Sequence, residues 1–300
     1  MFKRIAILGE IGSGNLGDDL GYLLIKKEIE KNFDFIQIDW VTPSRFSQLD
    51  YMGYDMVVLG CGTLLDRAGG HYVTKLYDMQ KRGIPTAILG SGLSDDKHIP
   101  DTNEGIQIYD KVMQKVKYKY LRGEAPDPMW LLGDQKTEGG HDKIGINMGF
   151  AGYTVGSIFD IKAKVEALRS HLALNKQPTK TVTCWGNDNA WIGNPDIEID
   201  CNLESISKLN ELKAIVAFRG HLGVVAACCG VIPIAIAYSS KIEKMYEGVG
   251  VPVTFLDVDQ KDWGNKVEDG LTKGGDFRNA IIEAQQKVQT KIKEFCKEMK

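Results

Sequence analysis

The feature that most constrains this chain is the regular alternation of short apolar runs, rich in strand-forming residues, with segments of helical pattern. Such alternation is typical of parallel sheets that are covered by helices on both faces. A chain of 300 residues, 43% of them hydrophobic, can bury the cores of two such sheets. The candidate strands are Arg4–Leu8, Phe35–Trp40, Met56–Leu59, Thr86–Leu89, Lys119–Leu121, Lys143–Asn147, Thr181–Trp185, Ala214–Phe218, Ile232–Ala237 and Val253–Leu256.

The strand series breaks at the polar, glycine-containing segment Gly133–Asp142 and restarts at Lys143. We therefore expect an α/β protein with two Rossmann-like, doubly wound parallel-sheet domains, residues 1–140 and 141–300, that face each other across a cleft. The long amphipathic helix predicted over 277–297 is a candidate to pack back on the N-terminal domain. Because ligands of such sheets bind outside the carboxyl ends of the strands, the residues that follow each strand are the functional candidates.

Charge and composition exclude several classes of protein. A net charge of −3 argues against nucleic-acid binding through bulk charge, but it leaves open a local basic site for a small anion. The apolar run Ile5–Leu8 is too short for a secretory signal, and no stretch is long enough to span a membrane. The six cysteines are scattered without CxxC pairs, so we expect reduced thiols in a cytoplasmic protein without structural zinc. Whether the chain forms a homo-oligomer stays open.

The loop after the first strand, Gly12–Gly17, fits the dinucleotide pattern GxGxxG, and Asp39 lies about where a ribose-binding acid would stand. However, Asp18 and Asp19 follow at the helix N-terminus, where they would repel a pyrophosphate. An NAD-dependent dehydrogenase is therefore a weak alternative. The loop is otherwise an aspartate-capped turn, or a site where Asn15, Asp18 and Asp19 accept hydrogen bonds from sugar hydroxyls.

Further candidates follow other strands. Two glycine-rich turns, Gly60–Gly62 and Gly90–Gly92, are expected to line the cleft. Arg219 and His221 follow one strand, and Tyr238–Lys241 follows the next, so that parallel pairing would bring them to one edge as an anion site.

Two other segments have alternative interpretations. Arg122 follows the strand Lys119–Leu121 and is either a second anion ligand or a surface arginine. Trp185 and Trp191 flank a polar loop, where they pack on a sugar ring or anchor the loop.

Four stretches together resemble the polysaccharide pyruvyl transferase family. They are Gly12–Asp19, Gly60–Asp66, Tyr120–Arg122, and the run from Arg219-Gly220-His221 through Gly230–Pro233 to Tyr238–Lys241. Cys61 replaces a glycine of the family pattern, and Gly220 stands where leucine is usual. We expect Gly220 to loosen the turn that carries Arg219 and His221.

This resemblance implies a GT-B-like fold and transfer of a pyruvyl group from phosphoenolpyruvate to hydroxyls of a sugar, in a cell-surface polysaccharide or its precursor, forming a ketal without a cofactor or metal. For this reaction His221 is the candidate general acid or, alternatively, only a ligand of the phosphate, and Asp18 is the candidate base. The implied substrate-binding residues are Arg219, Lys241, Arg122, Ser239, Asn15, Asp19, Gly14 and Gly62. Two alternatives stay open: a GT-B glycosyltransferase that uses a nucleotide-sugar, and a non-catalytic sugar- or anion-binding relative.

Overall fold

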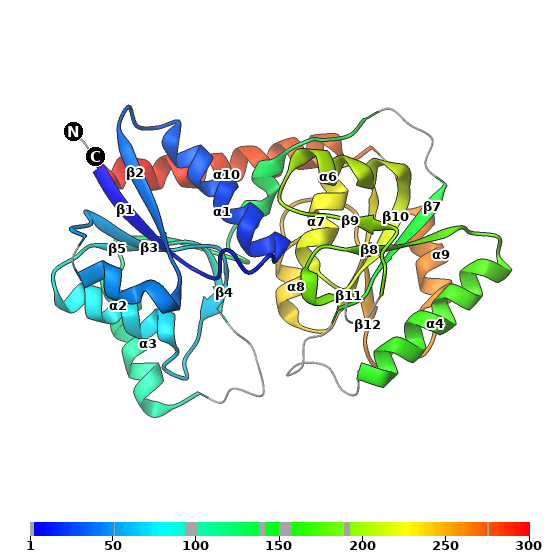
Figure 1. Ribbon diagram of the computed structural model, residues 1–300, viewed down its shortest axis with the longest axis horizontal. Coiled ribbons are helices and arrows are strands. Elements are labelled where there is room, and N and C mark those ends of the chain that lie inside the picture. Colours follow the sequence, from blue (N-terminus) through cyan, green and yellow to red (C-terminus); the bar gives the residue numbers. More distant parts are fainter. Residues whose placement is uncertain are drawn as a thin grey trace. The chain divides into compact units, whose positions relative to one another are not determined.

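The computed structural model describes residues 3–50, 52–93, 101–137, 142–149, 158–188, 193–274 and 276–300. The chain divides into two compact units. Unit 1 comprises Met1–Ser13, Asp18–Leu131 and Gln286–Lys300, and unit 2 comprises Gly14–Gly17 and Leu132–Gln285. Strands and helices alternate along the chain in both units (Figure 1). In this division the chain passes between the units after residues 13, 17, 131 and 285.

Unit 1 is built on a sheet in which all the paired strands run parallel. Its strands follow the order β2-β1-β3-β5-β4, and β6 also pairs with β5. The order reverses at β1, which lies between β2 and β3. The strands are β1 (Lys3–Leu8), β2 (Ile36–Val41), β3 (Met56–Leu59), β4 (Gly62–Leu65), β5 (Thr86–Leu93) and β6 (Tyr118–Leu121), and the helices are α1 (Leu16–Glu30), η1 (Pro43–Asp50), α2 (His71–Lys81), α3 (Asn103–Lys115) and η2 (Pro128–Leu132).

The two glycine segments expected as turns in unit 1 are partly strand. Val57 pairs with Thr86 and Gly62 pairs with Ser91, so β4 continues the pairing of β3 along β5. Gly62 has a φ of +122° and Gly90 a φ of +77°, and the β5–β6 register shifts next to Gly90. Glycine tolerates these φ values within a strand, so the chain kinks there without leaving the sheet.

Unit 2 contains a sheet in the order β12-β11-β10-β7-β8-β9, again with parallel pairing between neighbours. This order is that of a doubly wound dinucleotide fold, and it reverses between β7 and β10. The strands are β7 (Lys143–Asn147), β8 (Thr179–Thr183), β9 (Ile197–Glu198), β10 (Leu212–Ala217), β11 (Ile232–Ala237) and β12 (Thr254–Asp257), and the helices are α4 (Ile158–Leu174), η3 (Gly186–Asp188), α6 (Leu203–Ser207), η4 (Lys208–Glu211), α7 (Gly220–Cys228), α8 (Ser240–Lys244) and α9 (Gly264–Thr272).

The C-terminal helix α10 (Arg278–Met299) contributes to both units, because its residues from Gln286 onward count with unit 1. Within unit 1, the hydroxyl of Tyr118 donates a hydrogen bond of 2.6 Å to the carbonyl of Lys291. The ring of Phe295 is buried and lies 5.8 Å from that of Tyr118. The apolar stripe of the helix therefore completes the core of unit 1.

The cores consist of the aliphatic strand residues and the apolar faces of the helices that pack on them. Helix α7 is buried almost all round, which its small and apolar residues predict. Cys228 and Cys229 are buried in it, as expected for packing residues. In the parts of the chain that the structure describes, no helix is long and apolar enough to cross a membrane.

Candidate functional site

The main candidate site lies at the carboxyl ends of β7, β8, β10 and β11, where the strand order of unit 2 reverses. Asn147 is the last residue of β7 and is fully buried. Its side-chain oxygen accepts a hydrogen bond of 3.0 Å from the backbone N–H of Arg219, which follows β10. The Asn147 amide therefore fixes the start of the turn that leads into α7.

The guanidinium of Arg219 is bound to a buried carboxylate. Its Nη2 lies 2.7 Å, and its Nε 3.1 Å, from Oδ1 of Asp188, whose side chain has no exposed area. The guanidinium carbon also lies 4.4 Å from the centroid of the Trp185 ring, a cation–π distance. Burial raises the pKa of Asp188, while Arg219 and Asn147 act in the opposite direction by stabilising the carboxylate.

The glycine loop of the N-terminus also reaches this site, because Gly14–Gly17 counts with unit 2. The backbone N–H of Leu16 donates a hydrogen bond of 3.2 Å to the carbonyl of Cys184, which follows β8. A Cβ on Gly17 would collide with Nδ1 of His221 in the first turn of α7. Gly17 therefore leaves the space that the imidazole occupies.

The residues after β11 reach the same edge as those after β10, as predicted. The ring of Tyr238 stacks on that of Phe218 with centroids 4.5 Å apart. The hydroxyl of Ser239 accepts a hydrogen bond of 3.4 Å from the N–H of Lys241 and caps α8. Nζ of Lys241 lies 5.1 Å from the Tyr238 ring centroid. This edge thus collects an imidazole, an ammonium group and the N-terminus of α7.

Gly220 does not loosen the Arg219–His221 turn, contrary to expectation. It is buried in the first turn of α7. A Cβ at this position would lie 2.6 Å from Sδ of Met245 and 2.9 Å from Cδ1 of Ile242. The missing side chain therefore lets the α8 segment pack closely against α7.

In unit 1, Asp18 lies beside Gly62, the first residue of β4. A Cβ on Gly62 would lie 3.3 Å from Oδ1 of Asp18. Burial raises the pKa of the Cys61 thiol, and the charges of Asp18 and Asp127 add to the increase. This thiol is therefore a packing group and not a nucleophile.

Arg122 follows β6, as predicted, but it is buried. Its Nε lies 2.7 Å from Oδ2 of Asp127, and each side chain is 1% exposed. Nη1 donates a hydrogen bond of 3.2 Å to the hydroxyl of Thr63. The interpretation of Arg122 as a surface arginine is therefore wrong.

Other candidates have structural partners. Oδ1 of Asp19 accepts a hydrogen bond of 2.6 Å from the N–H of Gly12, and Oδ1 of Asn15 accepts one of 3.1 Å from the N–H of Gly17. Gly14 has a φ of +73° in the same loop. These residues hold the loop in shape at the start of α1.

Asp39, the candidate ribose ligand of a dehydrogenase, is also engaged. Burial alone would raise the pKa of its carboxyl, but hydrogen bonds from Gln37, Arg4 and Tyr54 bring it below its ordinary value. Two of these donors lie 2.8 Å (Arg4 Nη2) and 3.0 Å (Tyr54 hydroxyl) from Oδ2. The carboxylate thus ties neighbouring parts of unit 1 together.

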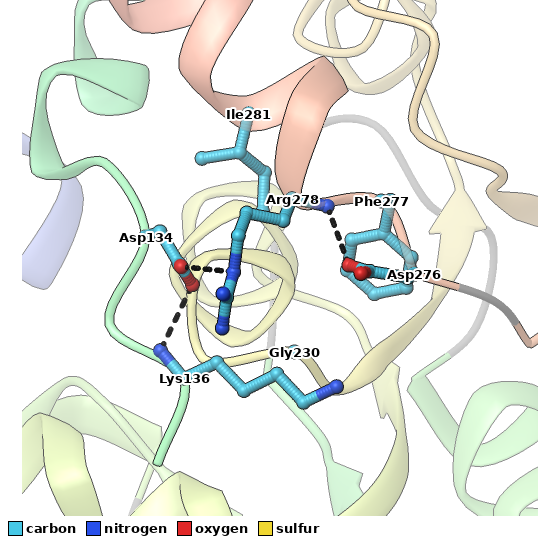
Figure 2. A pocket seen from close by; sticks show the side chains of 7 residues that line it. All are labelled: Asp134, Lys136, Gly230, Asp276, Phe277, Arg278 and Ile281. Carbon is cyan, nitrogen blue, oxygen red and sulfur yellow. Dashed lines mark hydrogen bonds and ion pairs between the residues drawn. The ribbon is translucent and has the colours of Figure 1, made fainter.

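Two hollows are found among the described residues of unit 2. One, beside the N-terminus of α10, measures about 10 Å³, and its lining includes an ion pair of 2.6 Å between Arg278 and Asp134 (Figure 2). It has room for about one water molecule. The other measures about 400 Å³, between α8 and β12, and its charged lining residues are Glu243, Lys244 and Glu247. The acidic excess of that lining makes it unsuited to a phosphate.

The strand-end rule located Arg219, His221, Lys241 and Arg122 correctly after their strands. It missed the role of Asn147, although a polar residue that ends an apolar strand is the signal that could have found it. It also missed Asp188 as the partner of Arg219, because that pairing joins separate loops. The candidate sugar-packing residue Trp191 lies outside the described residues.

No family model matches this sequence, and no curated protein matches it either. Solved structures do match. UDP-GlcNAc 2-epimerase from Methanocaldococcus jannaschii, solved with UDP-GlcNAc and UDP, has a TM-score of 0.51 and 12% identity, over 94% of this chain and 98% of that chain. The S. aureus MnaA–UDP structure has a TM-score of 0.58 and 9% identity, over 96% and 91%. The glycosyltransferase SnogD from Streptomyces nogalater has a TM-score of 0.51 and 13% identity, over 98% and 99%.

These likenesses confirm the predicted GT-B-like α/β fold. The expectation of pyruvyl transfer from phosphoenolpyruvate is wrong: the similar structures are UDP-GlcNAc 2-epimerases and glycosyltransferases, and they favour the nucleotide-sugar alternative.

Proposed function

We propose that this protein is a GT-B enzyme that binds a nucleotide-sugar at the strand ends of unit 2 and transfers its sugar. The observation that carries the proposal is the match, over nearly the whole chain, to glycosyltransferases and UDP-GlcNAc 2-epimerases, two of which were solved with UDP. A match of this kind supports a ligand class only where the site has suitable chemistry.

The strand-end site of unit 2 has such chemistry. The N-terminus of α7 presents backbone N–H groups, and the helix dipole favours an anion there. His221 lies in that first turn, and an imidazolium donates well to a phosphate oxygen. Lys241 follows the neighbouring strand as a second cation. This combination of helix N-terminus and cationic side chains suits a diphosphate.

We assign the reaction roles by the same chemistry. His221 binds a phosphate oxygen of the leaving nucleoside diphosphate and offsets the charge that develops there as the sugar bond breaks. The residues that bind and orient the diphosphate are then Lys241 and the first turn of α7.

Calorimetry with UDP, UDP-GlcNAc and thymidine diphosphate tests the proposal, with phosphoenolpyruvate and NAD as comparison ligands. We expect saturable binding of a nucleotide to the wild-type protein and a loss of about tenfold or more in His221→Ala. The control is His71→Ala, which changes an exposed histidine at the start of α2. Binding of phosphoenolpyruvate or NAD in place of every nucleotide would overturn the proposal.

Mass spectrometry of the products then separates the reactions. A glycosyltransferase releases UDP from UDP-GlcNAc when an acceptor sugar is added. An epimerase changes the sugar without an acceptor, and several of the similar structures are epimerases. Nucleotide binding without turnover under either condition would indicate a non-catalytic relative and would refute the proposed transfer.

A further inference from the structure

The arginine of the unit 2 site, Arg219, is held by three neighbouring groups. Its backbone N–H is held by Asn147, its guanidinium by Asp188, and its flat face by the Trp185 ring. The Arg219 side chain is 14% exposed and the Asp188 side chain 0%. This arginine therefore keeps one orientation and offers little of its surface to a ligand.

The carboxylate of Asp188 also changes what Arg219 does to its surroundings. With Oδ1 2.7 Å from Nη2, the two opposite charges act on a distant ligand as a dipole and not as a unit positive charge. A site built only to attract anions gains nothing from such a carboxylate, because burying it costs desolvation energy. Asp188 must therefore contribute to the orientation of the Arg219 guanidinium, to selectivity among anionic ligands, or to both.

Nucleotide-sugars and free nucleoside diphosphates differ in charge at one position. The terminal phosphate of UDP has a second ionisable oxygen with a pKa of about 6. In a UDP-sugar that phosphate is esterified and lacks this ionisation. A site with one positive charge too many would hold the more highly charged UDP more tightly than the UDP-sugar, and would release the product slowly.

We propose that Asp188 is a specificity-determining residue that compensates Arg219, so that the unit 2 site favours the esterified diphosphate of a nucleotide-sugar over a free diphosphate. This inference rests on the proposed function for the identity of the ligand. Its physical content is that the local positive charge is one unit lower than the basic residues alone would produce. That content holds for any phosphate ligand of the site.

The test compares the affinities of UDP and UDP-GlcNAc in the wild-type protein and in Asp188→Asn. The amide keeps the size of the carboxylate and an accepting oxygen, but it removes the charge. We expect the affinity ratio of UDP to UDP-GlcNAc to rise about tenfold in the variant. A purely structural role would lower both affinities together, and an unchanged ratio would refute the proposal.

Two further variants fix the cause. In the double variant Asp188→Asn with Arg219→Gln the pair is neutral again, so the affinity ratio of UDP to UDP-GlcNAc should equal that of the wild type. This comparison can be made even if Asp188→Asn alone does not fold. Asp196→Asn removes a carboxylate of the same unit that is bonded to Thr181 and not to an arginine, and it should leave the ratio unchanged. A shifted ratio in the neutral pair, or a shift in Asp196→Asn equal to that in Asp188→Asn, would overturn the proposal.

Inorganic pyrophosphate separates this inference from the proposed function. If no nucleotide binds to the wild-type protein, the proposed function fails, but Asp188→Asn should still bind pyrophosphate about tenfold more tightly than the wild type does. If nucleotides bind and pyrophosphate affinity does not rise in the variant, the charge-compensation inference fails alone.

Discussion

The buried ion pair Arg122–Asp127 allows a direct test of how much an arginine at a strand end stabilises the fold through its aspartate partner. Replacing Arg122 with methionine leaves the Asp127 carboxylate buried with the N–H of Met129, 2.9 Å from Oδ1, but without its cation. Removing one member of a buried ion pair costs about 3–5 kcal/mol. The lost hydrogen bond to Thr63 adds about 1 kcal/mol to this cost. Methionine also removes the buried Nη2, which has no hydrogen-bond partner among the described residues, and this gain cancels a similar amount. We therefore expect a loss of about 4 kcal/mol.

Guanidinium chloride unfolding, followed by tryptophan fluorescence, measures this loss. Trp130 is fully buried and donates its backbone N–H to the carbonyl of Asp127, so it reports on this region. The control, Arg82→Met, removes an arginine that is 42% exposed and paired with Asp50, and it should cost about 1 kcal/mol or less. Replacing both members, Arg122→Met with Asp127→Leu, should recover most of the loss. A loss below about 1 kcal/mol in Arg122→Met would show that the buried Asp127 carboxylate does not depend on Arg122, and would refute the reasoning from the buried ion pair.

Three other predictions concern stability and the site. The hydrogen bonds that lower the pKa of Asp39 stabilise the fold above the unfolded pKa of about 3.9. This contribution is lost as the pH falls through the lower pKa of the folded state. Asp39→Asn should therefore flatten the acid side of a plot of melting temperature against pH. Gly220→Leu should cost about 1–3 kcal/mol by collision with Met245, and Met245→Ala should restore part of it, as measured by thermal unfolding; an unchanged melting temperature would contradict the packing. Gly17→Ala should displace His221 and weaken UDP binding in calorimetry about as much as His221→Ala does, whereas wild-type affinity would contradict the contact.

Much of the fold could be predicted from the sequence because parallel strands buried on both faces are continuous apolar runs. The predicted strands Met56–Leu59, Lys143–Asn147 and Ile232–Ala237 agree with β3, β7 and β11 at both ends. Strand β4 was missed because glycine at 60 and 62 is also typical of a turn, and only its pairing with β5 shows that the chain stays in the sheet.

The site was predictable to the level of the strand ends but not to the level of partners. A basic residue after a parallel strand must lie at the ligand-binding edge, so the positions of Arg219 and Arg122 follow from local pattern. The net charge around each arginine does not follow from local pattern, because it depends on the aspartate that pairs with it. Asp188 is 31 residues from Arg219, and its loop leaves a different strand, so only the packed structure shows that the carboxylate is buried against the guanidinium. The same holds for Asp127, where sequence proximity to Arg122 says nothing about the 1% exposure of both side chains.

The glycines around α7 show why a motif match can mislead about chemistry. In a dinucleotide fold the glycines of GxGxxG allow the phosphates to approach the backbone, and the third allows close helix packing. Here Gly17, the third glycine, leaves room for His221, while a Cβ on Gly149 would lie 2.7 Å from Nε of Arg219 and 2.8 Å from Oδ1 of Asp188. The space that a side chain at Gly17 or Gly149 would need is thus occupied by the His221 imidazole and by the Arg219–Asp188 ion pair. Glycine in such a loop indicates that something approaches the backbone closely, and at these two positions the groups that approach are the His221 imidazole and the Arg219–Asp188 ion pair of unit 2.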